Sequence, residues 1–81
     1  SSSFADMYLD HPVSRQFGRA WNDLRVRTPE RCTEAFIKKW FQTLDQQGVV
    51  KDFVIDQDAD GFDVGFEDDA GDWHHLSVEK P

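Results

Sequence analysis

The chain has 81 residues, of which 31% are charged and 14% aromatic, and its formal net charge at pH 7 is −7. A chain of this length is too short to hold two independent hydrophobic cores, so the sequence predicts a single domain over residues 1–81. The high aromatic content argues against intrinsic disorder, because buried rings contribute much of the stability of a small core.

The shortest predicted element lies at the N-terminus, where Ser3 and Asp6 form a variant of the capping box and predict a short helix over residues 4–9. From Val13 to Leu24 the apolar residues recur with the spacing of one helix face, which predicts a helix over residues 12–26.

A second helix is predicted over residues 29–46. Thr28 is a favourable N-cap residue, Pro29 suits the first helical position, and Gly48 can adopt the left-handed conformation that often follows a helix. The apolar residues of this segment cover about half of the helix circumference, enough to contact both the first helix and a sheet.

After Val49 the apolar period changes from 3.6 to 2, and three runs, 49–55, 62–67 and 73–79, read as strands separated by turns rich in Asp and Gly. Short connections between strands imply an antiparallel meander. The predicted fold class is therefore α+β: two helices, with the short N-terminal helix in addition, packed on one face of a three-stranded antiparallel sheet in the order α-α-β-β-β.

The strongest local motif is the run from Asp56 to Glu67, which places oxygen ligands and a glycine as in the calcium loop of an EF-hand. The resemblance is confined to this loop, because both flanks read as strands where an EF-hand has helices. A strand would also carry Glu67 away from the turn. We therefore interpret the run as an acidic hairpin turn, with any calcium binding weak and confined to the turn.

The histidine pair and the lone cysteine could take part in chemistry, but each has a structural interpretation. His74 and His75 beside Asp72 suggest a metal site, but neighbouring side chains of a strand point to opposite faces, so we expect one histidine at the core edge and the other in solvent. Cys32, the only cysteine, belongs to the apolar set of the second helix and is interpreted as a packed residue. Residues 1–81 contain no phosphate-binding loop or nucleophile motif, so we expect no enzyme activity, no metal and no cofactor.

The lone cysteine also excludes an intramolecular disulfide, which favours a reducing compartment. The sequence contains no apolar run long enough to span a membrane, and its first residues lack the pattern of a signal peptide. We expect a cytoplasmic protein without membrane contact, although a mature secreted form that has lost its signal would have the same sequence.

The charge is unevenly placed: residues 1–48 carry seven Lys or Arg against six Asp or Glu, and residues 49–81 carry two against ten. Five arginines between Arg15 and Arg31 could contact phosphates, but the net charge and the interleaved acidic residues favour a solvated mixed-charge face. We therefore expect no direct nucleic-acid binding.

The acidic half is the most distinctive surface feature, and it predicts a non-enzymatic protein that binds a basic protein surface. The predicted contact residues are Asp56, Asp58, Asp60, Asp63, Glu67, Asp68, Asp69 and Asp72. Small size and acidity are similar to those of anti-CRISPR and anti-restriction inhibitors that imitate nucleic-acid charge, a similarity of composition alone. Two alternatives remain open: charge that only keeps the protein in solution, and a structural or assembly subunit that self-associates through helix 29–46, so that the protein is a monomer or a homodimer.

Calcium binding at the Asp56 to Glu67 run provides a first test. Because the predicted strands keep Glu67 from closing the ligand cage, a calorimetric titration at physiological ionic strength should show no site with a dissociation constant of about 10 μM or tighter, the range of sensor EF-hands. Binding in that range would contradict the hairpin interpretation.

Overall fold

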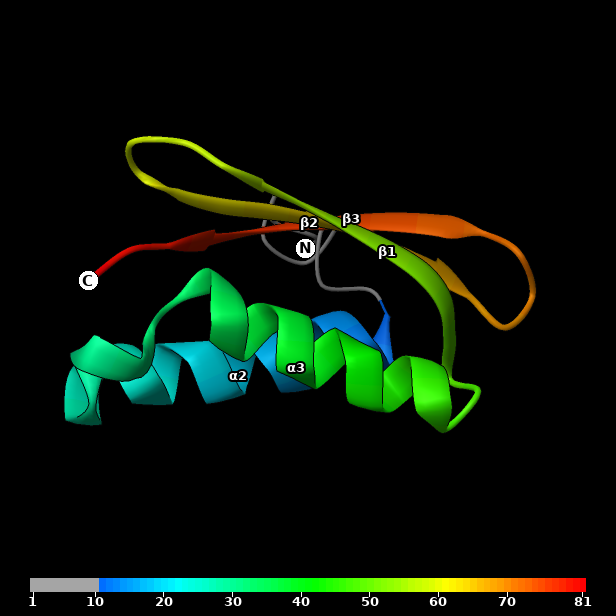
Figure 1. Cartoon of the computed structure of the whole chain (residues 1–81), viewed down its shortest axis with the longest axis horizontal. Coiled ribbons are helices and arrows are strands. Elements are labelled where there is room, and N and C mark those ends of the chain that lie inside the picture. The colour runs from blue at the N-terminus through cyan, green and yellow to red at the C-terminus, as the bar shows by residue number, and fades with distance from the viewer. Residues whose placement is uncertain (1–10) are drawn as a thin grey trace, which may run out of the picture.

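Two helices, a short 3-10 turn and three strands make up most of residues 11–81, the part of the chain that the computed structural model describes (Figure 1). The elements are α2 (Pro12–Arg27), η1 (Pro29–Arg31), α3 (Glu34–Gln46), β1 (Val50–Gln57), β2 (Gly61–Asp68) and β3 (Trp73–Glu79). Their order and class confirm the α+β prediction. The helix expected over residues 4–9 lies outside the described residues.

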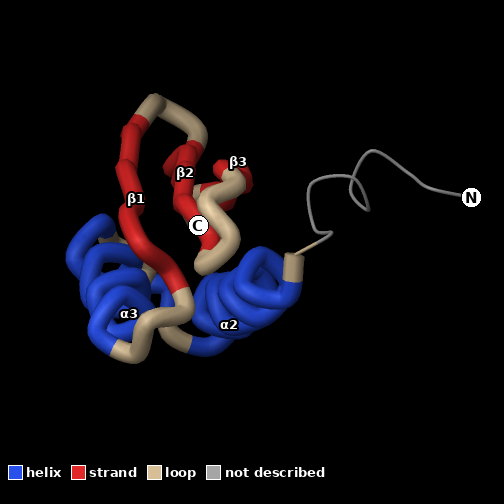
Figure 2. The backbone as a smooth tube through the Cα atoms, turned by 90° about the vertical axis from the view of Figure 1, so that its right-hand side faces the viewer, coloured by secondary structure: helices blue, strands red, loops and turns tan. Residues whose placement is uncertain are grey.

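The sheet is an antiparallel meander with strand order β1-β2-β3. Val64 in the central strand lies opposite Ile55 of β1 and Leu76 of β3, which fixes the register across all three strands. Both helices cover the same face of the sheet: α3 packs against β1, and α2 contacts β3 (Figure 2). The other face of the sheet carries no element among the described residues.

The first helix begins as predicted. His11 is its N-cap, with extended backbone angles, and its ring nitrogen Nδ1 accepts a hydrogen bond from the Val13 N–H at 3.1 Å. Pro12 occupies the first turn, where the N–H that it lacks would have had no intrahelical partner. A histidine therefore performs the capping task that Ser, Thr, Asp or Asn usually perform.

The second helix begins later than predicted. Pro29 starts only the 3-10 turn η1, and the α-helix begins at Glu34 with Thr33 as its N-cap. Thr33 has the extended backbone of an N-cap and accepts from the Phe36 N–H at 3.2 Å, whereas the Thr28 side chain makes no capping hydrogen bond. The predicted end is confirmed, because Gly48 follows the helix with a positive φ of 76°.

The core is an aromatic layer between the helices and the sheet. Phe17 and Trp21 of α2, Phe41 of α3 and Phe66 of β2 are all fully buried. Phe41 joins the layers, with ring centroids 5.3 Å from Phe17 and 5.6 Å from Phe66. The Trp21 indole also donates from Nε1 to the Glu79 carbonyl oxygen at 2.7 Å, which connects α2 to the end of β3.

Across residues 11–81, neither helix combines the length and the apolar character that crossing a membrane requires.

The Trp21 bond predicts a mutational effect. Trp21→Phe keeps an aromatic ring in the core but removes the donor, so the Glu79 carbonyl loses its partner, and we expect a loss of about 1–3 kcal/mol in the free energy of unfolding. Urea denaturation measures the loss, and Trp73→Phe at the 54% exposed Trp73 is the matched control, expected to change stability by less than about 0.5 kcal/mol. Equal effects of the two substitutions would contradict the assigned role of the indole N–H.

Candidate functional site

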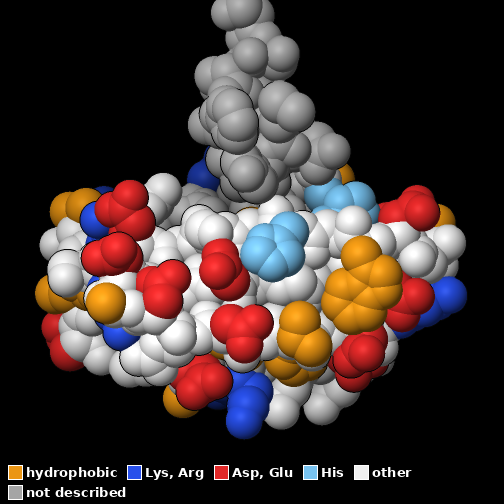
Figure 3. Space-filling view, turned by 90° about the horizontal axis from the view of Figure 1, so that it is seen from above, with side chains coloured by type: hydrophobic (Ala, Val, Ile, Leu, Met, Phe, Trp, Pro, Cys, Tyr) orange, Lys and Arg blue, Asp and Glu red, His pale blue; other side chains and the backbone are white. Residues whose placement is uncertain are grey.

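The face of the sheet that the helices leave uncovered, here called the open face, combines acidic and apolar side chains (Figure 3). Because Phe62, Val64 and Phe66 point into the core, the alternate residues of β2 point outward, as do their partners in the register. The open face consists of Asp52, Val54, Asp56, Asp63, Gly65, Glu67, Trp73, His75 and Ser77.

An apolar strip formed by Val54, Gly65 and Trp73 runs diagonally across the open face. Val54 is 53% exposed and Trp73 54% exposed, large fractions for side chains of this kind. Gly65 separates Val54 from His75, and a Cβ added there would lie 3.2 Å from Val54 Cγ2 and 3.7 Å from His75 Cδ2. The missing side chain therefore lets the two neighbours approach each other over the central strand.

Carboxylates flank the apolar strip in opposed pairs. Asp56 lies directly across from Asp63, and Asp52 lies across from Glu67. Like charges in directly opposite positions destabilise a sheet. The ion pairs found among residues 11–81 involve none of these four carboxylates. Asp52 and Asp56 are exposed, whereas Asp63 and Glu67 are partly buried and Asp63 accepts a hydrogen bond from the Ser77 hydroxyl.

The two turns of the meander hold further predicted contact residues at opposite ends of the sheet. Asp58 and Asp60 lie in the β1–β2 turn, and Asp69 and Asp72 in the β2–β3 turn; all four are exposed. The eight residues of β2 separate the turns by about 25 Å. The predicted contact residues therefore do not form one cluster.

The β1–β2 turn is a hairpin turn of the kind expected from its sequence. Its flanks are strands, and the Asp58 carboxylate accepts from the backbone N–H groups of Asp60 and Gly61, both at 2.8 Å. Asp58 thus stabilises its own turn. Glu67 lies at the far end of β2, opposite Asp52. Calcium binding remains a prediction to be tested.

The expectation that Asp68 is exposed is wrong, because this residue is 7% exposed and points toward the helices. The physical reason is the period of the strand: Asp68 follows Phe66 by two residues and therefore lies on the same, buried side of β2. The sequence pattern assigned Asp68 to the acidic turn, whereas it is the last residue of the strand. It is not available as a contact residue for a partner.

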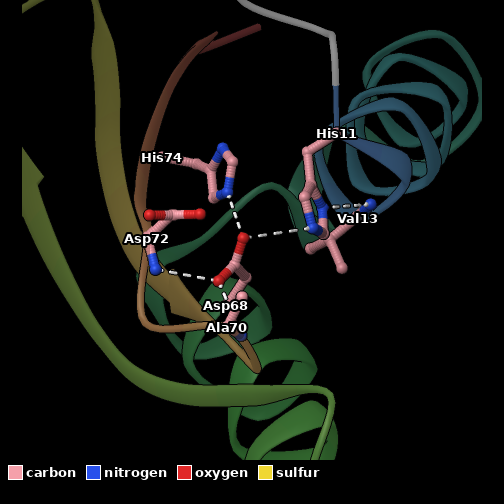
Figure 4. Close-up of polar contacts among 6 residues, drawn as sticks. All are labelled: His11, Val13, Asp68, Ala70, Asp72 and His74. Carbon is pink, nitrogen blue, oxygen red and sulfur yellow. Dashed lines mark hydrogen bonds and ion pairs between the residues drawn. The ribbon is translucent and has the colours of Figure 1, made fainter.

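Asp68 is the centre of a polar group that we call the His-Asp-His cluster, formed by His11, Asp68 and His74 (Figure 4). The carboxylate oxygen Oδ1 accepts from the backbone N–H groups of Ala70 and Asp72, both at 2.9 Å. The other oxygen, Oδ2, lies 2.7 Å from His74 Nε2 and 3.9 Å from His11 Nε2. One buried carboxylate therefore connects the start of α2, the β2–β3 turn and β3.

These hydrogen bonds favour the ionised form of Asp68. The bond from His74 and the bonds from the backbone N–H groups of Asp72 and Ala70 together lower the pKa of the Asp68 carboxyl below its ordinary value, in spite of its burial. A lowered pKa in the folded state means that the ionised carboxylate stabilises the fold at pH values above the ordinary Asp pKa. This contribution is lost as the pH falls through the lowered pKa.

Packing holds the two imidazole rings of the cluster. The His74 ring stacks on Phe66 with centroids 5.1 Å apart, and the His11 ring meets the same phenylalanine at 5.3 Å with an interplanar angle of 70°. The two imidazoles lie 4.4 Å from each other. Their orientation is therefore set by the core and not by solvent.

The prediction for the histidine pair is confirmed: His74 is half-buried on the helix side, and His75 is exposed on the open face. Sequence reasoning missed His11 as their neighbour. No local pattern connects residue 11 with residues 68 and 74, and the sequence shows His11 only as the residue before Pro12.

Cys32 lies between η1 and α3, outside the second helix, and is buried in the core, and two of the arginines form ion pairs. Burial raises the pKa of the Cys32 thiol, which fits a packed residue rather than a nucleophile. Arg27 pairs with Asp23 at 2.8 Å, and Arg25 with Glu79 at 3.3 Å. The Arg27–Asp23 pair lies within α2, as expected for a mixed-charge helix face, whereas Glu79, the partner of Arg25, belongs to β3.

A groove of about 400 Å³ runs along the solvent side of α3. Phe36, Trp40 and Leu44 form its apolar wall and remain partly exposed, and Arg31 and Lys39 border it. The groove contains much of the apolar face of the predicted helix 29–46, the surface expected to mediate self-association in the alternative function.

Comparison of the chain with protein-family models, with curated proteins and with solved structures gave no match.

The network around Asp68 predicts that this carboxylate matters more for stability than its acidic neighbours. Asp68→Ala leaves the backbone N–H groups of Ala70 and Asp72 without their acceptor, so we expect a loss of stability several times that of the control Asp69→Ala, which changes an exposed side chain and should cost less than about 0.5 kcal/mol. Thermal unfolding at neutral pH in the presence of a chelator measures both. Similar unfolding temperatures for the two variants would show that the network contributes little.

Proposed function

We propose that this protein is a non-enzymatic binding domain whose open face engages a basic surface of another protein. The observation that carries the proposal is the arrangement of the open face: four carboxylates in opposed pairs, with no ion-pair partner among residues 11–81, around an exposed apolar strip. A basic partner would relieve the repulsion within these pairs, and the sheet would hold the carboxylates in fixed positions for it.

Within this interface the carboxylates and the apolar strip have different tasks. The contact residues proposed on the open face are Asp52, Asp56, Asp63 and Glu67, with Asp69 and Asp72 beside Trp73 and with Asp58 and Asp60 at the other end. Long-range attraction by these charges accelerates encounter with a basic surface. Burial of Trp73 and Val54 would then slow dissociation, because exposed tryptophans are frequent centres of binding energy in interfaces.

A more specific form of the proposal is that the partner is a nucleic-acid-binding protein. Rows of carboxylates on a rigid sheet can occupy a groove that normally holds phosphates, as inhibitors of the anti-CRISPR and anti-restriction kind do. The spread of the acidic residues over the open face and both turns, about 25 Å, fits an extended groove better than a single small pocket.

A second candidate function is supported by the groove on α3. Its wall of Phe36, Trp40 and Leu44 offers apolar surface to a second copy of the chain, as an assembly subunit would require. A concentration series in analytical ultracentrifugation separates the two functions, because a monomer at all concentrations removes the self-assembly proposal and leaves the open face as the binding surface.

The open face predicts distinct kinetic effects for charge and for Trp73. With the partner recovered by affinity capture, Asp56→Lys combined with Glu67→Lys should slow association about tenfold at low salt and flatten its salt dependence, since steering depends on the charge removed. Trp73→Ala should instead accelerate dissociation and leave the association rate nearly unchanged. Surface plasmon resonance at two salt concentrations measures both rates.

The matched control reverses two charges on the helices, Arg19→Glu combined with Lys38→Glu, both at exposed positions. These changes should leave binding to a basic partner unchanged or slightly stronger. The proposal fails if the helix variant loses binding while the open-face variants retain it, and the binding surface would then lie on the helical side.

A further inference from the structure

We propose that His11, Asp68 and His74 form a binding site for a divalent transition-metal ion of the zinc type. One ligand atom from each residue lies within 4.8 Å of the others, and the three residues come from the start of α2, the end of β2 and β3. Two imidazole nitrogens and one carboxylate oxygen are a ligand set that zinc accepts, with a water molecule in the fourth position. Calcium and magnesium prefer oxygen ligands alone.

The spacing of the ligand atoms is close to what such an ion requires. Bonds of about 2.0–2.2 Å in a tetrahedral arrangement place neighbouring ligand atoms about 3.4 Å apart. In the structure Asp68 Oδ2 lies 2.7 Å from His74 Nε2 and 3.9 Å from His11 Nε2. Shifts of less than about 1 Å would therefore convert the hydrogen-bonded cluster into a coordination site.

The surroundings of the cluster already hold the ligands as a metal site needs. Two backbone N–H groups fix Asp68 through Oδ1 and leave Oδ2 facing the imidazoles, and Phe66 orients both rings. The side chains of His11 and His74 remain 20% exposed, so an ion can enter from solvent.

Binding at this site has a structural consequence for α2. His11 Nδ1 accepts a hydrogen bond from the Val13 N–H, so the neutral ring carries its proton on Nε2, the nitrogen that faces Asp68. A metal ion bound to Nε2 displaces this proton, and the neutral ring then carries its proton on Nδ1. Nδ1 can then no longer accept the hydrogen bond from the Val13 N–H. Metal binding must therefore weaken the N-terminal cap of α2.

Calorimetric titration of the full chain with Zn²⁺ tests the site, with Co²⁺ as a spectroscopic probe and Mg²⁺ as a hard-ion control. We expect saturable one-to-one binding of Zn²⁺, the visible absorption of tetrahedral Co²⁺, and no comparable binding of Mg²⁺. Hydrogen exchange of the Val13 amide should accelerate on Zn²⁺ binding, while that of the buried Ile37 in α3 stays unchanged.

Three variants locate the ion. His74→Gln keeps an N–H donor for Asp68, and His11→Asn keeps a good N-cap, so both should fold and both should bind Zn²⁺ at least about tenfold more weakly. His75→Gln on the open face should bind like the wild type. Absence of Zn²⁺ binding, equal affinity in the wild type and the two cluster variants, or an equal loss in His75→Gln would overturn the proposal.

Discussion

The structure depends on the burial of one face of a small sheet. Three strands cannot form a closed core by themselves, so the inner face must be covered, and the aromatic layer of Phe17, Trp21, Phe41 and Phe66 fills the space between sheet and helices. Both helices cover the inner face of the sheet, α3 on the side of β1 and α2 on the side of β3. The outer face is consequently left without cover among the described residues.

One-sided burial also separates the charges. The period of two directs Phe62, Val64 and Phe66 inward and Asp63 and Glu67 outward, and the register aligns the outward acids of β1 with those of β2. The resulting repulsion between opposed carboxylates is a cost in stability that folding alone does not require. This cost, together with the exposed Trp73, supports the proposed role of the open face in recognition.

The same period explains why the buried polar cluster exists. Because β2 continues two residues beyond Phe66, Asp68 lies on the inner side of the sheet. A carboxylate buried there must find hydrogen-bond donors. The β2–β3 turn supplies two backbone N–H groups and β3 supplies His74. The His11 cap brings the second imidazole, so the start of α2 and the end of the sheet meet at one ionised group.

Local sequence patterns determined the fold class. The change of apolar period after Val49, the Asp and Gly turns and the left-handed Gly48 were sufficient for the element order, and alternation in β2 was sufficient for the two faces of the sheet. The start of the second helix was not determined, because Thr28 and Thr33 offer the same capping chemistry and only the path of the chain through η1 decides between them.

Tertiary structure alone decided the two candidate sites. The cross-strand register places acids that are several residues apart in sequence directly opposite each other. Because β2 extends one residue further than predicted, Asp68 lies in the interior and not at the surface. The approach of His11 to His74 follows from the packing of α2 against the sheet, a contact between distant segments that no local pattern encodes. Propensity and period act over a few residues, whereas a site is made by the elements that the core brings together.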